Sequence, residues 1–95
     1  MTAPTMSVLQ QHVLRALTEL HERGDYAFYT HTIANAAMVT PRHARIALRA
    51  LQRKGLVHLV RGLVDECTGE LRGSGYEPTD AGYHAVELLT QGRAA

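Results

Sequence analysis

The segment from Thr40 to Gly55 carries the signals of a helix at both of its ends. Thr40 precedes Pro41, and a threonine at the N-cap followed by a proline at the first helical position is a strong helix start. Gly55 fits a left-handed C-cap, and the charge of Lys54 suits the negative end of the helix dipole. We therefore predict a helix over residues 41–54, and any fold of this chain must accommodate it.

The two sides of this helix differ in chemistry. Ala44, Leu48 and Leu51 recur at helical spacing and are expected to pack inward, with Ala47 at the border of the apolar stripe. A helix that is docked by its apolar side and displays cations on the other has the size and chemistry to enter the major groove of DNA. The residues expected to face outward are Arg42, His43, Arg45, Ile46, Arg49, Gln52 and Arg53.

Basic charge is concentrated around the same segment, although the net charge of the chain is only +1. Residues 40–62 carry six basic side chains and no acidic one, whereas residues 63–95 carry two basic and six acidic side chains. Exposed helices usually mix the two signs and gain i,i+4 ion pairs. The acid-free block therefore favours a surface that attracts polyanions over an ordinary solvated helix face.

Two further helices are predicted before this block. Ser7 is expected to cap a helix that ends at Gly24, because apolar residues recur at helical spacing between them. Residues 27–29 are expected to form a short strand. A second helix is expected to run through Ala37, with either Thr30 or Thr32 as its N-cap.

After the basic helix, the sequence predicts a hairpin and a last helix. Residues 56–61 are rich in β-branched side chains and predict one strand, and the second strand is expected between residues 70 and 77. Thr79 is the expected cap of the final helix, and Asp80 lies in its first turn, where acidic residues are favoured.

The chain of 95 residues is expected to form one domain over residues 7–92, with a flexible arm at 1–6 and a tail at 93–95. A single cysteine, Cys67, cannot form an internal disulfide, and no apolar run is long enough to cross a membrane. The first residues also lack the basic start and apolar block of a signal peptide. These features together favour the cytoplasm.

The segment Thr32–Val57 contains the pattern Ile33-Ala34, Val39-Thr40, Ala44, Leu48, Leu51 and Gly55-Leu56-Val57, followed later by Tyr76-Glu77-Pro78-Thr79-Asp80-Ala81-Gly82. This pattern resembles winged helix-turn-helix transcriptional regulators of the MarR and PadR kind. The resemblance covers about residues 8–90. It implies an α+β, mostly helical fold with a three-helix core, a two-stranded wing and a C-terminal helix, bound to double-stranded DNA as a homodimer.

We predict from this pattern a sequence-specific regulator, a repressor rather than an activator, that reads the major groove with the helix at 41–54 and contacts the DNA backbone with the wing at 56–77. The candidates for base contact are Arg42, His43, Arg45 and Arg49, of which Arg45 and Arg49 divide base and phosphate contacts between them. The candidates for backbone contact are Thr32, Thr40, Arg53, Lys54, Arg61 and Arg72. Val86 and Leu89 of the last helix are the expected dimer contacts.

The sequence leaves one alternative of another class open, a winged helix that binds proteins, for example a phage or plasmid accessory protein acting on a host complex. The acidic wing residues Asp65, Glu66 and Glu70 favour this alternative, and the acid-free helix opposes it. Six histidines include no HxxxH pair, so a His/Cys metal site involving His58, Cys67 and His84 is the minor reading. No catalytic motif is present, and we expect neither an enzyme nor a cofactor. No effector is identified.

Overall fold

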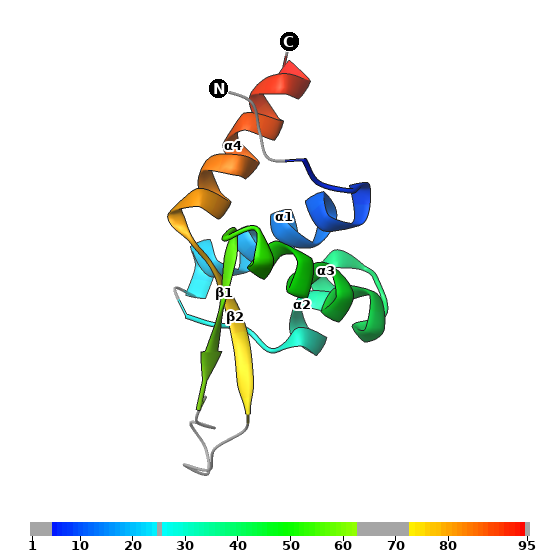
Figure 1. Ribbon diagram of the computed structural model, residues 1–95, viewed down its shortest axis with the longest axis vertical. Helices are drawn as coiled ribbons and strands as arrows, with labels where there is room; N and C mark the ends of the chain where they lie inside the picture. Colours follow the sequence, from blue (N-terminus) through cyan, green and yellow to red (C-terminus); the bar gives the residue numbers. More distant parts are fainter. Residues whose placement is uncertain (1–4, 25, 63–72, 95) are drawn as a thin grey trace.

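A computed structural model describes residues 5–24, 26–62 and 73–94 of the chain. Helices α1, α2 and α3 form a compact body, and the two strands and α4 project from it in opposite directions (Figure 1). The described elements are, in order, α1 (Val8–Gly24), α2 (Thr30–Ala37), α3 (Pro41–Arg53), β1 (Val57–Arg61), β2 (Ser74–Pro78) and α4 (Asp80–Ala94). The predicted fold class, a three-helix core with a two-stranded wing and a C-terminal helix, is confirmed.

The ends of α1 and α3 follow the local signals in the sequence. The Gln10 amide donates to the Ser7 hydroxyl oxygen at 3.1 Å, and the His43 amide donates to the Thr40 hydroxyl oxygen at 3.2 Å. Both bonds satisfy amides of the first helical turn, which have no partner within the helix. Gly55, directly after α3, has a φ of 76°, the left-handed conformation expected for a glycine at this place.

The start of α2 differs from the prediction that Thr30 or Thr32 caps this helix. The N-cap is Tyr29, which has extended backbone angles and makes no side-chain hydrogen bond to the helix. Thr30 is already the first helical residue, and Thr32 lies within the first turn. The start of α2 is set instead by Phe28, the residue before Tyr29. Phe28 forms a β-bridge with Tyr76 that holds this part of the chain extended.

The core lies where α1 meets α2, α3 and the base of the sheet. Its largest fully buried side chains come from every one of these elements: Val13, Leu14, Leu17, Ile33, Leu48, Leu51, Leu56 and Val57. Between α1 and α2, Phe28 is buried, whereas Tyr26 is 59% exposed and stacks on Phe28 with ring centroids 4.6 Å apart. Because aliphatic side chains from α3 fill this core, the opposite side of α3 is left for solvent or a ligand.

The wing is an antiparallel pair in which Leu59 faces Tyr76 and Arg61 faces Ser74. Backbone bonds of 2.9 and 2.8 Å between Phe28 and Tyr76 add the segment before α2 to the edge of β2. In place of the short strand predicted at residues 27–29, the structure has this single bridge at Phe28, which joins the wing to the helical body. The hairpin between the strands, with Cys67 and the acidic residues of the wing, lies outside the described residues.

Helix α4 begins against the backbone that follows α3. The Thr79 hydroxyl donates to the Gly55 carbonyl oxygen at 2.7 Å and accepts from the Gly82 amide at 3.1 Å, which confirms Thr79 as the cap. A Cβ atom on Gly82 would lie 2.1 Å from the Leu56 carbonyl oxygen, so this close approach requires glycine. The helix continues to Ala94, two residues beyond the predicted domain limit at residue 92.

The predicted flexible arm at residues 1–6 does not extend to residue 6. Met6 is buried in the core, and the Lys54 amine donates to the Thr5 carbonyl oxygen and to the Gln10 side-chain oxygen, both at 2.6 Å. Residues 5 and 6 are therefore part of the folded domain.

Candidate nucleic-acid interface

Helices α2 and α3 are joined by a tight turn whose geometry is fixed by the backbone. The amides of Met38 and Val39 donate to the carbonyl oxygens of Asn35 and Ala34 at 3.2 and 3.0 Å. Met38 adopts a left-handed conformation with a φ of 59°, and its side chain is 89% exposed. Val39 is half-buried and packs against the core. These contacts fix the orientation of α3.

The exposed side of α3 is the one that the sequence predicts. Ala44, Ala47, Leu48 and Leu51 are buried beneath the helix, and Ala50 joins them at 8% exposure. All seven residues predicted to face outward are exposed: Arg42, His43, Arg45, Ile46, Arg49, Gln52 and Arg53. We refer to these seven residues as the α3 face.

The four arginines of the α3 face make no ion pair or hydrogen bond with any residue in the described part of the chain. This is unusual for so dense a group of cations, because acidic residues normally alternate with basic ones on a solvated helix. Each guanidinium group keeps its five N–H donors available, in the planar geometry that suits phosphate oxygens and guanine. As far as the described residues show, these four arginines can therefore bind an anion without first breaking an internal contact.

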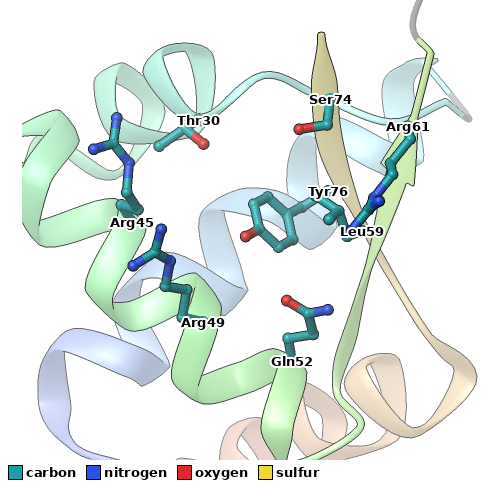
Figure 2. A pocket seen from close by; sticks show the side chains of 8 residues that line it. All are labelled: Thr30, Arg45, Arg49, Gln52, Leu59, Arg61, Ser74 and Tyr76. Carbon is teal, nitrogen blue, oxygen red and sulfur yellow. The ribbon is translucent and has the colours of Figure 1, made fainter.

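A groove with a volume of about 470 Å³ separates the α3 face from the wing. Figure 2 shows its two walls, with Arg45, Arg49 and Gln52 on α3 and Arg61 and Tyr76 on the strands. Thr30, Leu59 and Ser74 complete the lining. The groove thus combines three guanidinium groups with neutral hydrogen-bonding side chains, which is a composition that suits a phosphodiester.

Tyr76 also lines the groove, although the sequence alone does not mark it as a candidate for DNA contact. Its hydroxyl is directed toward α3 (Figure 2), while its backbone pairs with Phe28 and Leu59 on the two sides of β2. The signal that could have found it is strand periodicity. Ser74 and Tyr76 are two residues apart, as are Leu59 and Arg61, so once the register is known all four fall on one face of the sheet.

At the start of α3, the structure shows how His43 is held. Its Nδ1 atom lies 2.6 Å from the Thr40 hydroxyl oxygen, which also accepts the His43 amide hydrogen. If the hydroxyl hydrogen points to Nδ1, the neutral ring carries its proton on Nε2, where it can be donated to a phosphate or a base edge. In that arrangement the Thr40 hydroxyl hydrogen is not free to donate to a phosphate.

The other residues predicted to contact the DNA backbone differ in how accessible they are to DNA. Arg61 lines the groove, and Arg53 is exposed in the last turn of α3. Contact of Lys54 with DNA would first require its two bonds to the N-terminal segment to break. Thr32 is half-buried in α2, and Arg72 lies outside the described residues. The DNA contacts of all these residues stay predictions.

One histidine of the wing and one of α1 lie close to the same carboxylate, that of Glu77. His58 Nε2 lies 2.6 Å from one oxygen of Glu77, directly across the sheet, and His21 Nε2 lies 4.0 Å from the other oxygen. His21 also bonds the Tyr83 hydroxyl through Nδ1 at 2.6 Å. Within residues 5–24, 26–62 and 73–94, no three histidine, cysteine, aspartate or glutamate side chains are arranged to hold a metal ion.

Val86 and Leu89, the predicted dimer contacts, are partly buried against the core of their own chain. Part of each side chain therefore already packs within its own chain, and contact of these two residues with a second chain stays a prediction. In the part of the chain that the structure covers, no helix has the length and apolar character that crossing a membrane demands.

The fold and the α3 face together define a winged helix-turn-helix protein. Solved structures of one such protein, MepR of Staphylococcus aureus, resemble this chain closely. A point mutant of MepR matches with a TM-score of 0.73 and 25% identity over 94% of this chain. A second point mutant, bound to an oligodeoxyribonucleotide, matches with a TM-score of 0.73 and 26% identity over 94% of this chain. A MepR–DNA complex matches with a TM-score of 0.68 and 25% identity over 94% of this chain.

MepR is described as a transcription regulator of the multidrug efflux pump MepA. The resemblance to MarR-like winged helix regulators is therefore confirmed. This chain spans only 59% of the length of the first of these MepR chains. No protein-family model and no curated protein sequence matches it.

Proposed function

We propose that this chain is a sequence-specific double-stranded DNA-binding protein that regulates transcription. The observation that carries the proposal is the α3 face, whose four arginines are exposed and unpaired within the described part of the chain. The proposal is supported by the similarity to MepR structures that contain DNA. An exposed helix of 13 residues fits the major groove of B-DNA, which is about 12 Å wide.

In this proposal, α3 enters the major groove and the wing lies along the adjacent backbone. Arg42, in the first turn of α3, is the leading candidate to donate two hydrogen bonds to O6 and N7 of a guanine, with His43 beside it. Of the two roles that the sequence leaves open for Arg45 and Arg49, the groove favours phosphate contact for both, because they face Arg61 and Tyr76 of the wing.

A single domain of this size covers little DNA, so we propose binding as a homodimer on a palindromic site, acting as a repressor in the cytoplasm. Sedimentation at rising protein concentration tests the dimer, with a constant monomer mass as the contradicting result. If dimerisation uses α4, Leu89→Asp shifts the mass toward the monomer, and Glu87→Asp, at an exposed position of the same helix, is the matched control.

The experiment that tests the proposed function is selection of bound duplexes from a random library. We expect enrichment of one motif, and Arg42→Ala to relax selectivity at a guanine-containing base pair within it, at a cost of about 1–3 kcal/mol. Absence of any enrichment, together with no salt-dependent binding to random duplex, would favour the alternative of a protein-interaction module.

A further inference from the structure

Ile46 is the one apolar side chain on the α3 face. It is 55% exposed, and it lies one helical turn after Arg42 and three residues before Arg49. With 3.6 residues per turn, these three residues and Arg53 form a stripe along the side of α3 opposite its buried residues. Ile46 therefore lies among cations at the most exposed part of the helix.

Within the described part of the chain, Ile46 belongs to no apolar cluster that would explain this position. It is not part of the core or of the groups packed against it. It does not line the groove between α3 and the wing, which is faced by Arg45, Arg49 and Gln52. A β-branched side chain is also a weaker helix former than alanine, so local helix stability does not favour it.

The chemistry of the major groove restricts what such a side chain can contact. Guanine, cytosine and adenine present only hydrogen-bonding groups at this edge, whereas thymine adds its C5 methyl group. We propose that Ile46 is a specificity-determining residue that packs on the C5 methyl group of a thymine. This inference rests on the proposed function, because it requires α3 to enter the major groove.

The spacing of the stripe places that thymine relative to the base read by Arg42. Four residues of α-helix rise about 6 Å, and stacked bases along one strand are about 3.4 Å apart. The thymine is therefore expected within about two base pairs of the guanine that Arg42 contacts. Arg42 and Ile46 together would read a short guanine–thymine element, while Arg45 and Arg49 hold the backbone.

The test replaces thymine by deoxyuridine, which removes the methyl group and leaves every hydrogen-bonding atom in place. Each thymine of the selected motif is replaced singly on both strands, and binding is measured for the wild type, Ile46→Ala and Val8→Ala. Val8 is an apolar residue on α1 with 82% exposure and serves as the matched control. Circular dichroism verifies that the variants fold.

We expect one replacement to weaken wild-type and Val8→Ala binding by about fourfold, the factor for one buried methyl-sized group. Ile46→Ala should bind the thymine and deoxyuridine duplexes equally. A wild type insensitive to every replacement, an Ile46→Ala variant that keeps the difference, or a selected motif without thymine would overturn the inference. In each case DNA binding itself would persist, whereas failure of the proposed function would abolish it on all duplexes.

Discussion

Replacement of Arg49 by alanine tests whether the groove between α3 and the wing holds a DNA phosphate. Arg49 shares the groove with Arg45 and Arg61 and has no acidic partner among the described residues. Its removal leaves two guanidinium groups in place, so the expected loss corresponds to one phosphate contact. Each phosphate neutralised on B-DNA contributes about 0.9 to the slope of log K against log salt concentration.

The expected affinity change follows from that slope. At 0.1 M salt, one contact fewer lowers the association constant by about 0.9 decade, or roughly eightfold, which corresponds to about 1.2 kcal/mol. Because a phosphate contact carries no sequence information, the loss should be the same on a selected motif and on random duplex. Fluorescence anisotropy over a series of salt concentrations gives both the affinity and the slope.

Arg23→Ala is the matched control, since Arg23 is an exposed arginine in the last turn of α1, outside the α3 face. We expect its slope to equal that of the wild type. An unchanged slope for Arg49→Ala would refute phosphate contact by this residue. A loss confined to duplexes with one particular base pair would instead place Arg49 on a base edge.

Three further predictions concern the stability of the fold that supports the α3 face, each measured by urea unfolding. Gly82→Ala should lower the free energy of unfolding by about 2–4 kcal/mol, because the added Cβ atom would meet the Leu56 carbonyl oxygen at 2.1 Å. Helix propensity alone predicts that this substitution raises the free energy of unfolding by about 1 kcal/mol. A stabilised variant would therefore refute the steric argument. Thr40→Ala should lower the free energy of unfolding by about 1 kcal/mol, because the α3 helix loses its N-cap. Thr40→Ser keeps the hydroxyl and should lose much less stability than Thr40→Ala. Equal losses in the two variants would contradict the role of the Thr40 hydroxyl as the cap. Met38→Gly should raise the free energy of unfolding by roughly 1 kcal/mol, because Met38 has a φ of 59° and its side chain is almost fully exposed. A destabilised variant would show instead that the Met38 side chain stabilises the turn.

The parts of the fold that depend on short-range signals could be predicted from the sequence. Both ends of α3 are marked by Thr40, Pro41 and Gly55, and the spacing of its alanine and leucine residues identifies the buried side. The exposed α3 face follows directly, because a helix with one apolar stripe has only one other side to present.

The parts that depend on contacts distant in sequence could not be predicted. The N-cap of α2 is Tyr29 because Phe28 pairs with Tyr76, far along the chain in the wing. The bonds of Lys54 to Thr5 and Gln10 likewise join segments that no local pattern connects. The place of Tyr76 in the groove required the register of the wing, and a shift of one residue would have turned it to the other face.

Contact between the α3 face and DNA is tested most directly by the amide chemical shifts of the protein during titration with a selected duplex. We expect the largest changes in residues 41–53 and in the strand segments that border the groove, with small changes over most of α1. Changes concentrated in α1 and α4 while α3 is unaffected, or no changes at all at low salt, would contradict this contact.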